Sequence, residues 1–122
     1  MASELSGLEF DWFAVDGEGN LALFATAGEG FLPGSVGAHH GLHSELSDSL
    51  PTPRSGTPDA WNDYVALGLF VFDWALPGGP YEKRASPVGA ASQVLEKKVL
   101  ALPQLPRFSG SFSDINKIER WQ

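Results

Sequence analysis

The sequence predicts an α+β fold: a single domain spanning residues 1–122, with an antiparallel sheet built on two hairpins and packed by two or three short helices. Two pairs of aromatic and aliphatic runs, each joined by a turn rich in Gly, Asp or Pro, indicate hairpins over residues 10–26 and 69–85. Segments with apolar residues three or four apart lie between and after these pairs, and they predict the helices. A length of 122 residues is typical of one domain.

The first hairpin is the strongest signal in the chain. Its strands, residues 10–15 and 21–26, are apolar at most positions, and the turn over residues 16–20 contains Asp, Gly, Glu and Asn. Since both faces of each strand are mainly apolar, we expect other elements to cover both sides of this pair. Residues 1–8 form a loose polar lead-in.

Two helices are expected between the hairpins. An apolar stripe at every fourth position predicts the first, which ends at Pro51: Leu42, Leu46 and Leu50. The second begins with Thr57 as N-cap and Pro58 at the first helical position, and it stops at Gly68.

The last third of the chain is less regular. A short helix is favoured over residues 92–98, although residues 98–102 also alternate like a strand. Alternating apolar positions over residues 108–112 predict a strand, followed by a terminal turn of helix that carries Ile115, Ile118 and Trp121.

Charge is unevenly distributed along the chain, whose formal net charge is −7. Residues 1–80 carry eleven acidic residues against Arg54 alone, whereas residues 81–122 carry seven Lys and Arg residues and four acidic ones. Phosphate binding requires a positive field, so the acidic part argues against nucleic acid and favours a basic protein partner. A surface that only keeps the protein in solution would give the same composition.

The chain contains no Cys, which excludes disulfides and thiolate chemistry and suits a reducing compartment. No basic and apolar leader precedes the first strand, and no apolar stretch approaches the roughly 20 residues that a membrane helix needs. We therefore expect a cytoplasmic protein that does not associate with membranes.

Histidines suggest a metal site but do not complete one. His39 and His43 are four residues apart, as in helical metal-binding pairs. No third ligand follows at an obvious spacing, the Glu of the zinc-protease motif is absent between them, and Gly41 weakens the helix. Surface histidines are the favoured interpretation, and neither a metal nor another cofactor is expected.

Other motifs of binding and catalysis are incomplete. Residues 16–20 space oxygen ligands as a calcium loop does, but the later Gly and Glu of that loop are missing. Residues 28–30 lack the rest of a phosphate-binding fingerprint, and no Gly-x-Ser-x-Gly elbow occurs. No catalytic residues are therefore predicted.

Six carboxylates are the candidates for a face that docks onto a basic partner, with an exposed Trp or Tyr as anchor: Asp16, Glu18, Glu29, Asp59, Asp63 and Asp73. A competing hypothesis is a small-molecule or metal-binding protein, or a hydrolase, with a pocket near His39–His43. A subunit of a homo-oligomeric assembly is a third, because the sequence leaves the oligomeric state open.

Three blocks in the first quarter of the chain, residues 11–16, 19–24 and 28–33, together with residues 68–73, Tyr81 and Pro87, resemble a group of small bacterial proteins. These are immunity proteins of polymorphic toxin systems. The resemblance implies a compact, non-catalytic toxin neutraliser without a cofactor, and it implies no particular binding residues.

Overall fold

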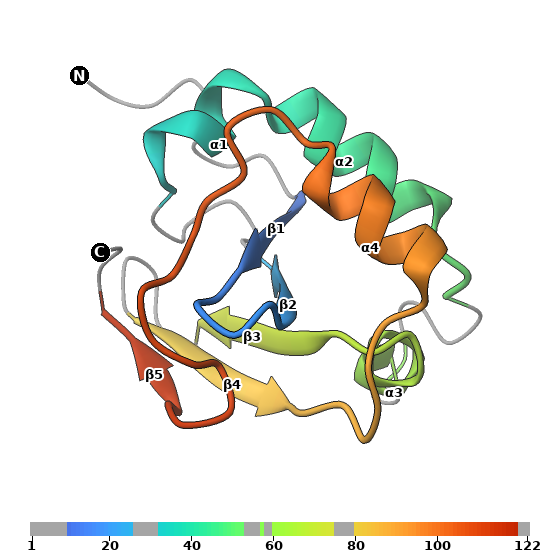
Figure 1. Ribbon diagram of the computed structural model, residues 1–122, viewed down its shortest axis with the longest axis vertical. Coiled ribbons are helices and arrows are strands. Elements are labelled where there is room, and N and C mark those ends of the chain that lie inside the picture. Colours follow the sequence, from blue (N-terminus) through green and yellow to red (C-terminus); the bar gives the residue numbers. More distant parts are fainter. Residues whose placement is uncertain (1–9, 26–31, 53–56, 58–59, 75–79, 120–122) are drawn as a thin grey trace.

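A computed structural model describes residues 10–25, 32–52, 57, 60–74 and 80–119 (Figure 1). The predicted lead-in over residues 1–8 lies outside this part. In chain order, the described elements are strands β1 (Asp11–Val15) and β2 (Leu21–Ala25), helices α1 (Gly34–Ala38), α2 (His40–Ser49) and α3 (Ala60–Ala66), strands β3 (Phe70–Trp74) and β4 (Tyr81–Ala85), helix α4 (Gln93–Leu100) and strand β5 (Lys117–Ile118).

The strands form one five-stranded sheet in the order β1-β2-β3-β4-β5, and the predicted α+β class is confirmed. Both predicted hairpins are present as the antiparallel pairs β1–β2 and β3–β4, and β5 adds to β4 antiparallel. The sheet is mixed, however, because β2 and β3 are parallel. Helices α1 to α3 carry the chain from the end of β2 back to the start of β3, and a crossover of this kind makes the two strands parallel.

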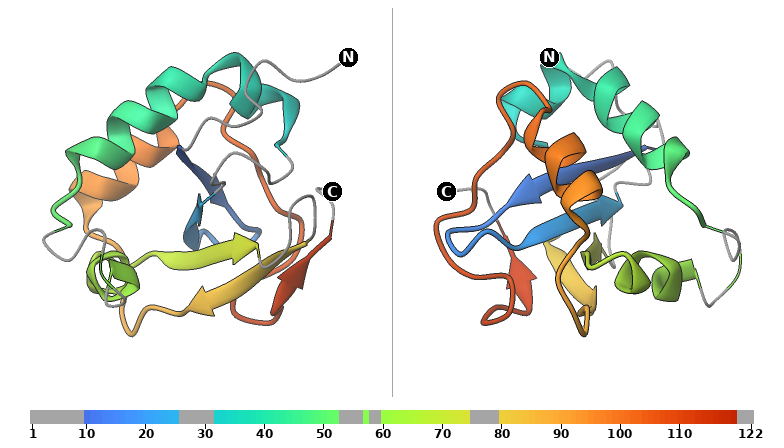
Figure 2. Two further views of the ribbon diagram at one scale, coloured as in Figure 1. Left: turned by 180° about the vertical axis from the view of Figure 1, so that it is seen from behind. Right: turned by 45° about the vertical axis from the view of Figure 1, so that its right-hand side comes forward.

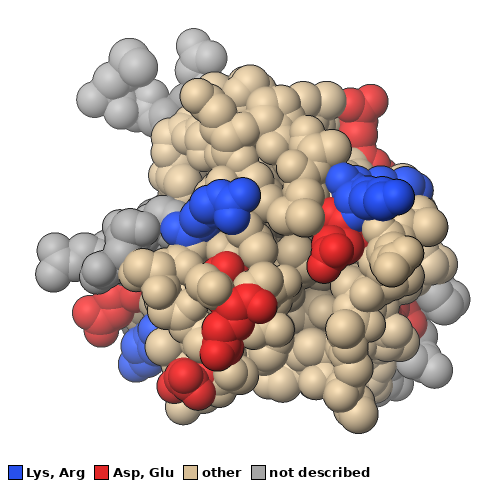
Figure 3. All heavy atoms as spheres, in the orientation of Figure 1, with Lys and Arg blue, Asp and Glu red and all other residues tan. Residues whose placement is uncertain are grey.

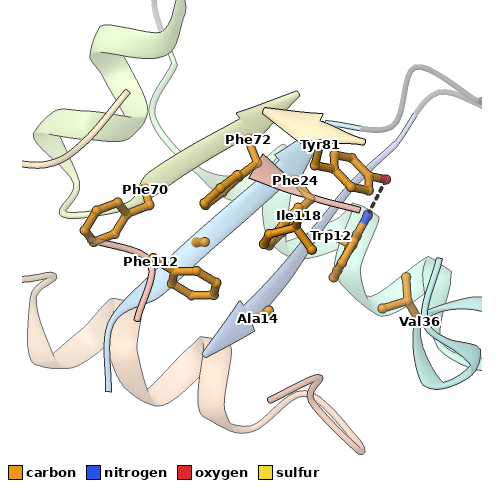
Figure 4. Packing of buried hydrophobic residues seen from close by; sticks show 10 residues of the cluster. Trp12, Ala14, Phe24, Val36, Phe70, Phe72, Tyr81, Phe112 and Ile118 are labelled. Atoms are coloured by element: carbon orange, nitrogen blue, oxygen red, sulfur yellow. Dashed lines mark hydrogen bonds between the residues drawn. The ribbon is translucent and has the colours of Figure 1, made fainter. Parts of the chain in front are cut away.

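One face of the sheet is aromatic. Trp12, Phe24 and Phe72 stack in sequence, with ring centroids 4.2 Å apart for the first pair and 4.9 Å for the second (Figure 4). The Trp12 indole Nε1 donates a hydrogen bond of 3.2 Å to the Tyr81 hydroxyl, and Phe112 from the chain near the C-terminus packs against the same cluster. Offset aromatic pairs of this kind add to the gain from burial alone.

The opposite face is mainly aliphatic, and α2 and α4 lie side by side over it (Figure 1, Figure 2). Phe13 and Leu23 from the sheet, and Leu69 just before β3, pack there against Leu95 and Val99 of α4. Both faces of the first hairpin are therefore covered, as its two-sided apolar strands predict.

The predicted helices are present with changed details. The single helix expected before Pro51 is two, because His39 leaves the helical conformation (φ −125°) between α1 and α2, so the described residues contain four helices. On α2, His43 and Ser47 are buried, whereas Leu42 of the predicted stripe is 44% exposed. Helix α4 begins where predicted, with the Ser92 Oγ accepting a hydrogen bond from the Leu95 N–H.

The strand predicted over residues 108–112 is wrong. Phe108 donates to the Val15 carbonyl (2.8 Å), and Val15 donates to the Pro106 carbonyl (3.1 Å), so this segment contacts β1 only through an isolated bridge at Arg107. The chain then continues as a loop, in which the Phe112 N–H donates a hydrogen bond to the Asp16 carboxylate and not to a neighbouring strand. Residues 115–119, the described part of the predicted last helix, contain β5 instead.

None of the described helices has the length and the hydrophobicity needed to cross a lipid bilayer.

Candidate functional site

Two carboxylates lie in one row across three strands. Asp11 of β1 pairs with Ala25 of β2, and Ala25 pairs with Asp73 of β3. Residues that are direct neighbours across strands point to the same face of a sheet. Since Ala25 has only a methyl group, the row leaves an open space between the two acidic side chains.

This space is part of a pocket of about 360 Å³. Its walls come from the row itself, from Phe10, from the second half of α2 and from α3. We call it the acidic pocket, and its lining residues are Phe10, Asp11, Ala25, Ser44, Ser47, Asp48, Trp61 and Asp73. Among the residues that the structure describes, the lining includes three carboxylates and no Lys or Arg.

Asp11 is the most buried carboxylate of the acidic pocket. Burial raises its pKa, and the negative charges of Asp48 and Asp73 raise it further, while hydrogen bonds from Ser47 and Tyr64 oppose the shift. The Ser47 hydroxyl donates to Asp11 Oδ2 at 2.6 Å. These neighbours hold the carboxylate in one orientation beside the space between the strands.

Asp73 lies on the other side of Ala25 and is half-buried. Burial raises its pKa, whereas the hydrogen bond of 2.8 Å from the Trp74 N–H and the charge of Arg84 lower it. Asp48 is exposed at the rim of the pocket. An ionised carboxylate with a raised pKa is stabilised by any cation that approaches it, so the acidic pocket favours positively charged groups.

The lining of the acidic pocket combines carboxylates with aromatic rings. Among the described residues, no group of three or more His, Asp or Glu side chains is placed to hold a metal. The indole of Trp61 and the ring of Phe10 instead offer aromatic surface next to the carboxylates. Aromatic faces and carboxylates together bind guanidinium and ammonium groups.

Of the four predicted docking residues that the structure describes, only Asp73 lines the acidic pocket. Asp16 is 4% exposed, and its carboxylate accepts hydrogen bonds from Glu18, Asn20 and Phe112, so it holds the hairpin turn at the opposite end of β1. Glu18 is exposed on the same turn, where its Oε1 accepts a hydrogen bond from the Ser111 hydroxyl (2.6 Å).

Asp63 on α3 is 7% exposed and does not line the acidic pocket. Glu29 and Asp59 lie outside the described residues. The described members of the predicted set therefore do not form one continuous face, because two of them, Asp16 and Asp63, are buried.

Among the described residues, no further His, Asp or Glu joins the histidine pair in a group of three that could hold a metal ion. His43 is fully buried, its Nδ1 accepts a hydrogen bond of 3.0 Å from the Phe13 N–H, and its ring stacks on that of Phe13. Burial, followed by the charge of His39, lowers the pKa of His43 to about 4, so its imidazole is neutral at pH 7. His43 thus supplies the acceptor for one N–H group on the free edge of β1. The acidic pocket lies farther along α2, at Ser44, Ser47 and Asp48.

Sequence reasoning missed Asp11 and Asp48. Asp11 had a usable signal, because a single acidic residue in an otherwise apolar strand must either face a polar partner or border a site. Asp73 is likewise the single acidic residue of an apolar run, Phe-Val-Phe-Asp-Trp. Asp48 had none, since exposed acidic residues on helices are common.

The described chain is thus an α+β domain with an acidic, aromatic-walled pocket at one end of a mixed sheet. No family model matches the chain, and searches of curated proteins and of solved structures found no match either. Its function must therefore be inferred from the pocket and its charges.

Proposed function

We propose that this protein is a non-catalytic acidic binding protein that docks onto a basic protein partner by seating an Arg or Lys side chain in the acidic pocket. The observation that carries this proposal is the convergence of Asp11, Asp48 and Asp73 on one cavity whose described lining residues include no Lys or Arg. Charge complementarity of this kind accelerates association and selects the partner.

The pocket favours the arginine side chain. A guanidinium is planar, so one face can lie on the Trp61 indole while its N–H groups point toward the carboxylates of Asp11 and Asp73. Since burial raises the pKa of both carboxylates, a bound cation would relieve an unfavourable charge as well as form hydrogen bonds. The acidic N-terminal two thirds of the chain would steer such a partner toward the pocket.

An immunity-type role in the cytoplasm fits this mode of binding. Neutralisation by occlusion requires only that the protein cover a basic surface of a toxin, and it needs no chemistry in the acidic pocket. If this is the role, the chain should relieve growth inhibition by a toxin encoded next to it, and Asp73→Asn should weaken the relief. Full protection by a variant without the pocket carboxylates would contradict it.

Calorimetric titration of the full chain with an arginine-rich peptide tests the binding mode. Asp48→Asn and Asp73→Asn should each weaken binding by about tenfold, which corresponds to about 1.4 kcal/mol. Asp114→Asn makes the same chemical change at an exposed residue outside the acidic pocket and should leave the affinity within about twofold.

Salt dependence provides a second measurement. Affinity for the peptide should fall steadily as ionic strength rises, because the contacts are between charged groups at a solvent-accessible site. Equal losses in Asp48→Asn and Asp114→Asn would mean that the peptide senses only net charge, and affinity independent of salt would contradict the proposed mechanism.

A small-molecule binder or hydrolase is the second candidate, at the acidic pocket and not near His39–His43, because a partly buried carboxylate with a raised pKa in the same pocket as a second carboxylate is also the arrangement of acid–base sites. Thermal stabilisation by a neutral sugar, lost in Asp11→Asn and accompanied by no response to the arginine-rich peptide, would favour this candidate over the docking function.

A further inference from the structure

A second hollow, of about 440 Å³, lies between α2 and the end of α4. We call it the α2–α4 groove. Leu42, Glu45 and Leu46 line it from α2, and Lys98 and Leu102 line it from the α4 side. At about 100° of rotation per residue, these α2 positions lie on the opposite side of the helix from Ser44, Ser47 and Asp48 of the acidic pocket. The two hollows are therefore separate surfaces.

Apolar side chains are exposed along the α2–α4 groove. Leu42 is 44% exposed on the α2 wall, and the α4 wall includes Ala101 and Pro103. Val94 is not in the lining itself, but it is 65% exposed on α4, one turn before Lys98 and on the same side of the helix. Single exposed apolar residues are ordinary, but apolar residues on both sides of a groove are typical of an interaction surface.

The two walls carry opposite charges. Glu45 lies on the α2 wall and Lys98 on the α4 wall, and neither forms an ion pair among the residues that the structure describes. Figure 3 shows basic side chains over α4 with acidic side chains next to them. A uniformly basic partner would meet Lys98, and a uniformly acidic one would meet Glu45, so neither kind of partner matches the whole groove.

A second copy of the chain matches both walls. A two-fold axis that runs along the groove places α2 of one protomer on α4 of the other. Because Glu45 and Lys98 line the same hollow, this rotation brings Glu45 of each protomer to Lys98 of the other. Leu42 and Val94 would then be buried between the protomers. An isologous contact of this type uses one self-complementary surface twice.

We infer that the α2–α4 groove is the interface of a symmetric homodimer, held by Leu42 and Val94 and aligned by two reciprocal Glu45–Lys98 pairs. The inference is independent of the proposed function, since the acidic pocket lies on the other side of α2 and stays open in such a dimer.

Sedimentation velocity of the full chain across the micromolar range tests this. The unaltered chain should show a concentration-dependent monomer–dimer equilibrium. Glu45→Lys and Lys98→Glu should each weaken dimerisation at least tenfold, because each puts like charges in contact at both reciprocal pairs. An equimolar mixture of these two variants should dimerise again, since Lys at position 45 then meets Glu at position 98. The variant that carries both changes should also recover the homodimer.

Apolar variants complete the test. Leu42→Gln should weaken the dimer, whereas Val88→Asp, at a fully exposed residue outside the α2–α4 groove, should not. A chain that stays monomeric at every concentration overturns the inference. A dimer that neither charge reversal weakens, or a mixture that fails to restore the dimer, overturns it as well.

Discussion

Asp11 and Asp73 occupy one row of the sheet with Ala25 between them, so that two strand spacings, roughly 10 Å, separate their backbones. Burial raises the pKa of both carboxylates, and the charge of Asp73 also contributes to the shift at Asp11. The chain therefore keeps two carboxylates in a position where their ionised forms are less favourable than in water. Residues that lower stability in this way are common at binding sites.

Asp11→Asn should stabilise the fold at pH 7 by about 1 kcal/mol, the usual scale for relieving an unfavourable group at a functional site. The asparagine carbonyl can still accept the hydrogen bond from the Ser47 hydroxyl, so the change removes charge and little else. Because the folded pKa of Asp11 is raised, its contribution favours the folded state below the pKa of the unfolded chain and is lost as pH rises through the folded value.

The advantage of the Asp11→Asn variant should therefore disappear in acid, where Asp11 itself is neutral. Urea denaturation at several pH values measures this. Asp114→Asn, at an exposed position, should change stability by less than about 0.5 kcal/mol at any of them. A destabilised Asp11→Asn variant at pH 7 would mean that the ionised carboxylate holds the fold together, contrary to the direction of its pKa shift.

The local parts of the fold could be predicted from the sequence. Asp, Gly and Asn set the first turn, Ser92 begins α4, and Gly68 ends α3, because each is a short-range effect of one side chain or one backbone angle. The parallel pairing of β2 with β3 could not be predicted in this way, since it depends on how α1 to α3 return the chain.

Which residues of α2 are buried was predicted only in part, because this too depends on contacts between segments that are distant in the sequence. The spacing of Leu42, Leu46 and Leu50 marks one stripe, but α2 packs against β1, where the Phe13 N–H needs an acceptor, and His43 supplies it. A polar residue thus displaces Leu42 from the core. For the same reason the carboxylates that converge on the acidic pocket could not be chosen from charge alone, because Asp16 and Asp63 are buried elsewhere.

His43 should make the fold sensitive to acid. Burial lowers its pKa from 6.5 to about 4, so its contribution to stability is present above pH 6.5 and is lost as pH falls through about 4. Protonation would also convert Nδ1 from the acceptor of the Phe13 N–H into a donor. Stability measured by thermal denaturation should fall as the pH is lowered between these two values. Unfolding in this range should take up one proton, because the imidazole is protonated in the unfolded chain and neutral in the folded one.

The variant His43→Leu separates the loss of the hydrogen bond with the Phe13 N–H from the titration of the imidazole. It should lose about 2 kcal/mol at pH 7, since the Phe13 N–H is left without its acceptor, but it should lack the proton uptake assigned to His43. His40→Gln, at a half-buried residue that contacts Phe10, should keep that uptake. An unchanged acid profile in His43→Leu would assign the sensitivity to other groups.

Asp16 should act on stability rather than on docking. Its Oδ1 accepts from the Glu18 and Asn20 N–H groups, and its Oδ2 accepts from the buried Phe112 N–H at 2.8 Å. Asp16→Ala should cost about 3 kcal/mol, because it leaves buried donors unpaired. Glu18→Ala loses one hydrogen bond, from Ser111, near the surface and should cost less than about 1 kcal/mol. Urea denaturation compares the two, and similar losses would show that the turn does not depend on the buried carboxylate.

Gly68, which follows α3, can be compared with Gly19 in the first hairpin turn. The comparison tests whether the close packing around Gly68 requires a glycine there. Both have a positive φ, 88° and 86° respectively, which any side chain makes unfavourable by about 1 kcal/mol. Around Gly19 nothing lies within 4 Å of an added Cβ, whereas at Gly68 that atom would come within 2.4 Å of the Ala91 backbone nitrogen. A clash with backbone cannot be relieved by turning a side chain.

Gly19→Ala should therefore cost only about 1 kcal/mol, while Gly68→Ala should cost about 3 kcal/mol or more, since the segment that leads into α4 must move away from the start of β3. Thermal denaturation of the two variants measures the difference directly. Because both share the same backbone strain, equal losses would mean that the close approach of residues 90–91 to Gly68 is not maintained in solution.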